Sequence, residues 1–295
     1  MSLVNSSATI LDGLNLSRIV QDQIQADISE KLALNYRMPS LDVILVGDNP
    51  ASQTYVRNKI KACTKCQING NVHNFPKEAS LKDIKAKIIE LNENPDCDGI
   101  LIQLPLPAHL PSQEILSLVD PNKDVDGLHP YNLGLLLSGD SYLQPCTPYG
   151  IMTLLNFYNI DLSGKSACVI GRSNLVGKPV SLLLAQKNAT VTLCHSKTAD
   201  LPDIAKASDI LIAAIGKPNF VDKNFIKKGA CVVDVGINYI NDASGKSVIT
   251  GDVVFEDALA NAKYITPVPG GVGPMTVSML LKNTYKAYIK KLIQQ

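Results

Sequence analysis

Short apolar runs of strand length alternate with segments of helical pattern along most of this chain. In the first half, strands are predicted over 41–47, 71–75 and 99–107. Helices are predicted between them, over 51–66 and 80–94. Strands that alternate with helices are typical of parallel sheets, because each helix carries the chain back to the start of the next strand. The order therefore predicts an α/β fold.

The second half repeats the alternation more regularly. Its strands are predicted at four apolar runs, 166–171, 190–195, 209–216 and 230–236. Helices are expected over 176–188 and up to Ala207, and the last helix is expected to end at about Lys291. This half therefore predicts a second parallel sheet.

The length of 295 residues favours two domains over one. The segment 120–147 is rich in Asp, Pro and Gly, which indicates a passage between domains. A helix is expected directly after it, with Thr147 as the cap and Pro148 in the first turn. The expected domains are 1–144 with 274–295, and 145–273.

Composition excludes several classes of partner. Hydrophobic residues make up 45% and charged residues 19%, which is typical of a globular protein. The net charge of +1 argues against nucleic acid or an anionic membrane as the main partner. No apolar run is long enough to span a membrane, and the first residues show no secretory signal. We therefore expect a cytoplasmic protein.

The seven cysteines are an odd number and lie mostly inside apolar runs, which favours buried, reduced thiols. Cys63 and Cys66 form a C-x-x-C pair, but a zinc site would need a second pair, and His73 alone is poor support. We therefore expect helix packing at this pair and no metal.

One lysine of the first predicted helix differs from the other cations there. At about 100° per residue, Lys59 falls among apolar residues beside Tyr55. The other three cations fall together on the opposite side, at Arg57, Lys61 and Lys65. Lys59 is then either a lysine that reaches water from the edge of the apolar stripe, or a partly desolvated lysine with a lowered pKa. The helix alone leaves both interpretations open.

The stretch GRSNLVGKP, residues 171–179, follows a predicted strand and opens a predicted helix. A phosphate-binding turn occupies this place in dinucleotide-binding folds. The usual G-x-G-x-x-G spacing is broken, because Ser173 and Val176 replace two glycines and Gly177 comes one place late. The setting favours a dinucleotide site, and a tight turn without a ligand is the alternative.

The end of the next strand favours NADP over NAD. An NAD site usually has an acidic residue there, whereas this chain has Cys-His-Ser-Lys at 194–197. Cations and a hydroxyl at this point, together with Arg172, suit the 2′-phosphate of NADP. Taken singly, Ser196 could be a helix cap and His195 a surface histidine.

Eight stretches together closely resemble the bifunctional methylenetetrahydrofolate dehydrogenase/cyclohydrolase family, from about residue 10 to about residue 285. They are TYVRNK (54–59), GILIQLPLP (99–107), KDVDG (123–127), PCTPYG (145–150), GRSNLVGKP (171–179), CHSKT (194–198), DVGIN (234–238) and TPVPGGVGPMT (266–276). The resemblance implies a folate-facing N-terminal α/β domain, an NADP-binding Rossmann-like domain, a cleft between them and a homodimer.

The resemblance also implies two reactions on one-carbon derivatives of tetrahydrofolate. NADP⁺ oxidises 5,10-methylenetetrahydrofolate to 5,10-methenyltetrahydrofolate, and water then opens this product to 10-formyltetrahydrofolate. No metal is implied, since hydride transfer needs only two carbon centres in proximity and orientation.

Four residues match the folate site of that family. Lys59 matches the catalytic lysine and Tyr55 the tyrosine beside it, while Gln103 matches the residue that holds the lysine. Asp126 matches the carboxylate that binds the donor edge of the pterin, and Asp124 is expected to be structural. Without the resemblance, KDVDG would be interpreted as an ordinary turn.

The remaining matches concern the cofactor and a loop over the site. The positions that match NADP contacts are Gly171, Arg172, Ser173, Ser196 and Ile237. The substrate loop PGGVG contributes Pro269, Gly270, Gly271 and Gly273, and its glycines allow the backbone to approach a ligand.

Three other functions are weighed against this one. Short-chain dehydrogenases also carry Tyr-x-x-x-Lys, but there the pair follows the glycine turn, whereas Tyr55 and Lys59 precede Gly171. A member with dehydrogenase activity alone is disfavoured because Lys59, Gln103 and Asp126 are all retained. The same intact set disfavours a non-catalytic protein that binds folate or NADP.

Overall fold

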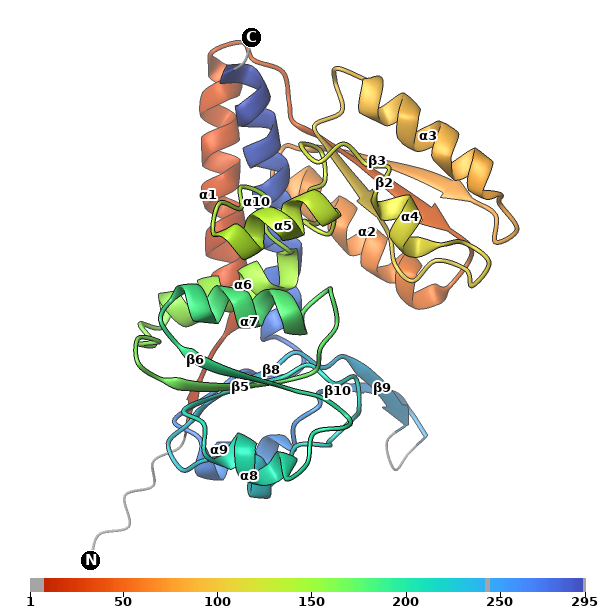
Figure 1. Cartoon of the computed structure of the whole chain (residues 1–295). Helices are drawn as coiled ribbons and strands as arrows, with labels where there is room; N and C mark the ends of the chain where they lie inside the picture. The colour runs from red at the N-terminus through yellow and green to blue at the C-terminus, as the bar shows by residue number, and fades with distance from the viewer. Residues whose placement is uncertain (1–7, 242–244, 294–295) are drawn as a thin grey trace, which may run out of the picture. The chain divides into compact units, whose positions relative to one another are not determined.

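The computed structural model describes residues 8–241 and 245–293, which form two compact units (Figure 1). The six-stranded unit comprises Met1–Ser17 and Thr147–Thr276, and the three-stranded unit comprises Arg18–Cys146 and Val277–Gln295. The expected domain of 1–144 with 274–295 differs at its start, because β1 (Thr9–Ile10) pairs with β11 (Tyr264–Ile265). Residues 1–7 and 294–295 of that expected domain lie outside the described part.

The sheet of the three-stranded unit has the order β3-β2-β4, with both pairs parallel. The strands are β2 (Ser40–Val46), β3 (Asn69–Phe75) and β4 (Gly99–Ile102). The predicted strand 99–107 is too long, because Pro105 and Pro107 cannot donate to the ladder. Helices α2 (Pro50–Lys65) and α3 (Leu81–Glu93) connect the strands, as predicted.

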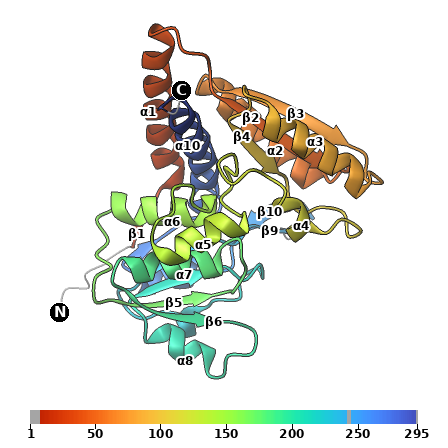
Figure 2. The same cartoon turned by 45° about the horizontal axis from the view of Figure 1, so that its top comes forward.

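The two faces of this sheet pack against different helices. Ile44 and Ile102 lie in a buried cluster with Ile84 and Ile88 of α3 and with Ile115 of α4 (Ser112–Leu116). α2 contacts β2 and β3 and buries Val56. Helices α1 (Gly13–Ala33) and α10 (Val272–Ile293) run side by side, and Gln21 Nε2 donates to Ser278 Oγ at 3.1 Å (Figures 1 and 2).

The sheet of the six-stranded unit has the order β1-β11-β8-β7-β5-β6, and every pair is parallel. Its four predicted strands are β5 (Ser166–Ile170), β6 (Thr190–Cys194), β7 (Ile210–Ala213) and β8 (Cys231–Asp234). Helices α6 (Cys146–Phe157) and α7 (Gly177–Gln186) cover one face, and α8 (Leu201–Lys206) and α9 (Phe255–Asn261) cover the other (Figure 1). The order reverses at β5, because β6 lies on one side of it and β7 on the other.

Several elements differ from the sequence predictions. The segment 120–147 is not a bare passage, because α5 (Pro130–Ser138) forms within it and ends at Gly139 with φ 91°. α6 begins at Cys146, so Thr147 lies in its first turn, and its hydroxyl is 3.0 Å from the Thr276 hydroxyl. The sequence analysis also did not predict helices α1, α4 and α9, strands β1 and β11, the turn η1 (Lys223–Phe225), or the antiparallel pair β9 (Asn238–Asn241) and β10 (Ser247–Thr250). No helix among the described residues is long and apolar enough to cross a membrane.

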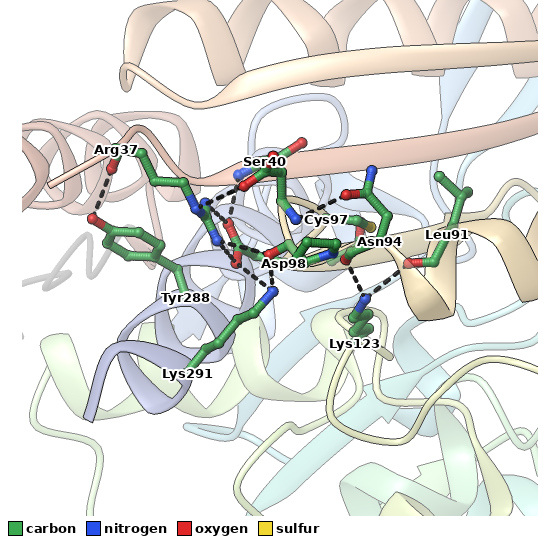
Figure 3. A network of polar contacts seen from close by, with 12 residues as sticks. Arg37, Ser40, Leu91, Asn94, Cys97, Asp98, Lys123, Tyr288 and Lys291 are labelled. Atoms are coloured by element: carbon green, nitrogen blue, oxygen red, sulfur yellow. Dashed lines mark hydrogen bonds and ion pairs between the residues drawn. The ribbon is translucent and has the colours of Figure 1, made fainter. Parts of the chain in front are cut away.

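A buried polar network fixes the amino-terminal edge of the three-stranded sheet (Figure 3). Asp98 accepts two hydrogen bonds from Arg37 at 2.7 Å and one from the Ser40 amide at 2.9 Å. The Tyr288 hydroxyl of α10 donates to the Arg37 carbonyl at 2.7 Å. Lys123 Nζ donates to three carbonyls at the end of α3, those of Leu91, Asn92 and Asn94. Lys123 therefore anchors the segment that continues into KDVDG.

Candidate functional site

Lys59 and Tyr55 lie one turn apart on α2. Lys59 is partly buried, whereas Arg57, Lys61 and Lys65 are exposed, so the predicted separation of the four cations is confirmed. The thiols of Cys63 and Cys66 are buried, and burial raises the pKa of Cys63 to about 12 and that of Cys66 to about 11. The C-x-x-C pair therefore contributes to helix packing.

Gln103 holds the ammonium of Lys59. Lys59 Nζ donates to Gln103 Oε1 at 2.9 Å. Gln103 Nε2 donates to the Leu104 carbonyl at 2.6 Å, which fixes the orientation of the amide and directs its oxygen at the lysine. The Gln103 backbone amide donates to the Ile44 carbonyl at 2.9 Å, so the side chain starts from a rigid strand end.

Lys59 and Asp126 interact electrostatically in a desolvated setting. Burial lowers the pKa of Lys59, and the nearby Asp126 carboxylate partly opposes this effect. Burial likewise raises the pKa of Asp126, opposed by Lys59 and by a hydrogen bond from the Cys146 thiol. The structure therefore brings Lys59, Gln103 and Asp126 together, with Tyr55 on the same helix as the lysine.

Asp124 and Asp126 have different surroundings although they are two residues apart. The Asp124 carboxylate is buried and accepts hydrogen bonds from the Leu128 amide at 3.2 Å, the His129 amide at 2.8 Å and Asn132 Nδ2 at 2.8 Å. These bonds build the start of α5, which confirms a structural role for Asp124. The Asp126 carboxylate has the Cys146 thiol and Lys59 as neighbours instead.

Two residues near Asp126 were not predicted from the sequence. The Cys146 thiol donates to the Val125 carbonyl at 3.3 Å, and the Cys146 amide donates to the Asp126 carbonyl. Asn283 of α10 is fully buried and donates to the carbonyls of Val125 at 2.9 Å and Gln144 at 2.8 Å. Both hold the backbone around Asp126, and no spacing in the sequence signals the link to Asn283, which lies more than one hundred residues away.

The turn between β5 and α7 has the geometry of a phosphate cradle. Gly171 has φ 123°, and a Cβ there would lie 2.1 Å from the Ala214 carbonyl oxygen. A Cβ at Gly177 would lie 1.8 Å from the Gly171 carbonyl oxygen. The Ser173 hydroxyl accepts from the Val176 amide at 3.1 Å and shapes the turn. The two glycines therefore allow the turn to pack tightly against the neighbouring backbone at the start of α7 despite the broken motif.

Arg172 and Ser196 follow the ends of neighbouring strands. Ile170 pairs with Cys194 in the β5–β6 register, so the two side chains leave the same edge of the sheet. Both are exposed, and neither has a hydrogen bond or ion pair with another described residue. His195 instead builds the turn, because its Nδ1 accepts from the Lys197 amide at 3.1 Å. Beside the cradle the structure thus leaves two donors with no partner among the described residues.

The loop PGGVG lies beside Ile237 within the six-stranded unit. A Cβ at Gly273 would lie 3.7 Å from Ile237 Cδ1. Gly270 has φ 112°, and its carbonyl accepts from the Leu14 amide at 2.8 Å. The Gly271 amide donates to the Pro267 carbonyl at 2.8 Å. The loop that contains Pro269 is therefore anchored at both of its first two glycines.

Two family models match this chain. Residues 11–126 match the catalytic domain of tetrahydrofolate dehydrogenase/cyclohydrolase, and residues 145–292 match its NAD(P)-binding domain. The chain belongs to the tetrahydrofolate dehydrogenase/cyclohydrolase family. The family resemblance and the α/β class with two domains are therefore confirmed.

Similar proteins of this family span nearly the whole chain. "Bifunctional protein FolD" of Nautilia profundicola is 50% identical over 279 residues, which cover 95% of this chain and 96% of that protein. The crystal structure of the bifunctional enzyme from Campylobacter jejuni is 45% identical with a TM-score of 0.91, covering 96% of this chain and 100% of that one. The Trypanosoma brucei enzyme, solved with NADP and an inhibitor, is 39% identical with a TM-score of 0.92, covering 97% and 99%.

The residues of the six-stranded unit fit NADP. Gly171 and Gly177 let the turn pack against backbone where a Cβ would not fit, and the amides of the first turn of α7 suit a pyrophosphate. Arg172 and Ser196 offer a cation and a hydroxyl at the position where a 2′-phosphate is read in such folds.

Proposed function

We propose that this chain catalyses both reactions of its family. The first is oxidation of 5,10-methylenetetrahydrofolate by NADP⁺, and the second is hydrolysis of the methenyl product to 10-formyltetrahydrofolate. The observation that carries the proposal is the lysine held by an amide. Lys59 donates to Gln103 at 2.9 Å, and burial lowers its pKa next to Asp126. A dehydrogenase alone would have no evident need of a lysine prepared in this way.

Lys59 is the proton-transfer residue of the hydrolysis. Water attacks the methenyl carbon and loses one proton, which leaves a hydroxyl on that carbon. The bond from the carbon to N5 then breaks as N5 gains a proton and the hydroxyl loses its proton to form the formyl C=O, so one proton is released overall. A lysine with a lowered pKa exchanges protons nearer neutral pH than an ordinary one, which suits both steps. Gln103 keeps the lysine nitrogen at one position, since its own amide is fixed by the Leu104 carbonyl.

Asp126 and Tyr55 bind the folate. A carboxylate accepts two parallel hydrogen bonds from the amino and ring N–H groups of a pterin. The Cys146 thiol and the Asn283 amide, which hold the residues around Asp126, support a fixed position for this carboxylate. Tyr55 offers a ring on the Lys59 face of α2 for stacking.

NADP binds to the six-stranded unit and folate to the three-stranded unit. Gly171 and Ser173 form the turn at the pyrophosphate, while Arg172 and Ser196 bind the 2′-phosphate. Ile237 completes the cofactor site, and the loop of Pro269, Gly270, Gly271 and Gly273 is assigned to substrate binding. When bound, NADP⁺ supplies the hydride acceptor. The match of residues 145–292 to the NAD(P)-binding domain supports this assignment.

The experiment measures both reactions on the purified protein. We expect reduction of NADP⁺ with methylenetetrahydrofolate, slower reduction of NAD⁺, and hydrolysis of methenyltetrahydrofolate. Both rates should exceed those of matched mixtures without enzyme. Rates equal to these controls in both assays would contradict the proposal, and oxidation without hydrolysis would reduce it to a dehydrogenase.

We also propose that the protein is a homodimer formed at β3. Among the described residues, β3 pairs only with β2, so its other edge is open. A groove of about 460 Å³ lies beside it and is lined by Val56, Ile60 and Val72 with Arg57 and Lys61 at its rim. A second copy covers this apolar groove and pairs the edge. Sedimentation should give twice the mass of the chain, and a monomer at micromolar concentration would contradict it.

The protein works in the cytoplasm. All seven cysteines are buried free thiols, which suits a reducing compartment. Fractionation of cells that express a tagged chain tests this assignment, and recovery of the protein outside the cytoplasmic fraction would contradict it.

A further inference from the structure

Two buried carboxylates lie at the carboxyl edge of the six-stranded sheet, where neither contacts a cation among the described residues. Asp252 is 0% exposed and Asp234 is 3% exposed. Carboxylates this deep are rare without a positive partner, because burial disfavours their charge. Their hydrogen bonds explain how they are tolerated and what they hold.

Asp252 binds the loop that follows β7. Its carboxylate accepts from three successive backbone amides, those of Ile215 at 2.6 Å, Gly216 at 2.9 Å and Lys217 at 3.0 Å. Successive amides that converge on one point form an anion-binding nest. Here the anion is part of the chain, so Asp252 fills the nest and ties the loop down through three hydrogen bonds.

Asp252 also reaches the segment after β8. Its Oδ1 accepts from Asn238 Nδ2 at 2.9 Å. Asp234, the last residue of β8, accepts from the Gly236 amide at 2.9 Å. Ile237 therefore lies between Gly236, which is bonded to Asp234, and Asn238, which is bonded to Asp252. Its own side chain is 40% exposed and free to contact a ligand.

The two carboxylates are tied to each other through the backbone. Asp234 accepts from the amides of Asp252 at 2.9 Å and Val253 at 3.0 Å. A Cβ at Gly251 would lie 1.8 Å from Asp234 Oδ2, and one at Gly236 would lie 2.3 Å from Asp252 Oδ1. Each carboxylate thus packs directly against the backbone of the segment that holds the other, which couples the positions of the two loops.

These loops leave the sheet where α/β folds bind their ligands. They follow β7 and β8, and β7 pairs with β5 at the point where the strand order reverses. The cradle at Gly171 leaves the same edge from β5, and its glycine faces the Ala214 carbonyl at the end of β7. The loop held by Asp252 therefore borders the cradle.

We propose that Asp252 and Asp234 are positioning residues for NADP, which fix Ile237 and the loop 215–217 in the shape that binds the cofactor. This inference rests on the proposed function. The two carboxylates act through backbone amides and do not touch the cofactor. The high pKa of Asp234, raised by burial to about 6 in spite of three amide donors, agrees with a carboxylate kept for its geometry.

Asp209 offers a matched control at the opposite edge of the same sheet. Its carboxylate accepts from the Ser166 amide at 3.0 Å and hydroxyl at 2.9 Å, and from Lys227 at 2.6 Å. It precedes β7, whereas Asp252 binds the loop after β7. Asp209→Asn thus removes a carboxylate that organises backbone in the same unit, away from the cradle.

The test measures NADPH binding by fluorescence titration and thermal unfolding of the apoprotein. Asp252→Asn places an NH₂ group against N–H donors and should displace the loop that they belong to. A displacement of about 1 Å away from the reacting atoms can lower the activity of an enzyme by about 100-fold. We expect NADPH affinity to fall at least about tenfold in Asp252→Asn and less than about twofold in Asp209→Asn. Both variants should unfold at lower temperature than the wild type.

Equal NADPH affinity in Asp252→Asn and the wild type would overturn the proposal, as would equal losses in both variants. If Asp252→Asn does not fold, Asn238→Ala replaces it, because it removes one of the four bonds to Asp252. We then expect a loss of about threefold, and an unchanged affinity would overturn the proposal. The titration needs no folate, so wild-type protein that binds NADPH but turns over neither folate would contradict the proposed function alone.

Discussion

In the three-stranded unit Lys59, Gln103 and Asp126 are wholly or partly buried and interact with one another, whereas in the six-stranded unit Arg172 and Ser196 are exposed and bond to no other described residue. Lys59 donates to Gln103 and interacts with Asp126, and burial shifts the pKa of both charged groups. Arg172 and Ser196 stand at exposed strand ends with no hydrogen bond or ion pair to a described residue.

The difference follows from what each site has to do. Hydrolysis needs a group that gains and loses protons, and burial is the means by which a protein adjusts a lysine for this task. Cofactor binding needs a shape and a few donors, which glycine turns, helix amides and exposed cations supply. Buried acids such as Asp252 then serve the shape of the site, while its exposed residues contact the ligand.

The largest effect is expected from Lys59→Met. It removes the proton-transfer group of the buried site and keeps the length of the side chain, so the rate of hydrolysis should fall by about 10²- to 10⁴-fold. Lys65→Met is the matched control, because Lys65 lies on the exposed side of the same helix and does not line the groove at β3. The decay of methenyltetrahydrofolate absorbance measures both variants. A hydrolysis rate in Lys59→Met close to that of Lys65→Met would contradict the role of Lys59 in proton transfer.

Arg172→Ala should have a smaller effect, confined to the exposed site. Loss of a charged hydrogen bond of about 1.5–3 kcal/mol corresponds to about 10- to 100-fold weaker NADP⁺ binding. NAD⁺ lacks the 2′-phosphate and should lose less than about threefold. Lys178→Ala is the control, because its ammonium already donates to Asn174 at 2.8 Å. Equal losses of affinity for NADP⁺ and NAD⁺ would contradict a contact between Arg172 and the 2′-phosphate.

The smallest effect concerns stability and pH. Burial raises the pKa of Asp234 from 3.8 to about 6, so between these values the folded chain holds a proton that the unfolded chain has lost. The contribution of this group to the free energy of unfolding should therefore fall by about 1–3 kcal/mol as pH rises from about 4 to about 6. Above that range its contribution should stay level.

Urea unfolding of the wild type and Asp234→Asn between pH 4 and pH 7 isolates this contribution. Asp209 gives the opposite sign, because its ion pair with Lys227 and its bonds to Ser166 lower its pKa to about 2. Its stabilisation is present above about 3.8 and is lost as pH falls towards 2. A difference between the wild type and Asp234→Asn that does not vary with pH would contradict the assignment to Asp234.

Local patterns in the sequence predict most of the strands and helices. They also predict which side of α2 carries Lys59. The 100° periodicity separates Lys59 from Arg57, because both lie on a single regular helix. The strand–turn–helix setting identifies the cradle even though its glycines are irregular. The end of β4 is missed, since two prolines stop the ladder at Ile102 while the apolar pattern continues.

Contacts between distant segments are beyond such patterns. Asp126 lies in the stretch KDVDG, whose composition is also typical of an ordinary turn. Only the family resemblance identifies it as a site residue. Asn283 and Asp252 act on loops far from them in sequence, and nothing beside them in the chain signals those bonds. Helix α1 is missed because its buried side chains, such as Leu16, Ile24 and Ile28, are sparse among polar residues.

The most direct test is a crossed measurement on Lys59→Met and Arg172→Ala. Each variant is assayed for hydrolysis of methenyltetrahydrofolate and for NADPH affinity by fluorescence titration. We expect Lys59→Met to lose hydrolysis and bind NADPH as the wild type does, and Arg172→Ala to show the reverse. If both variants lose the same property, or if either loses both, the two sites are not separate in the way their burial and charge indicate.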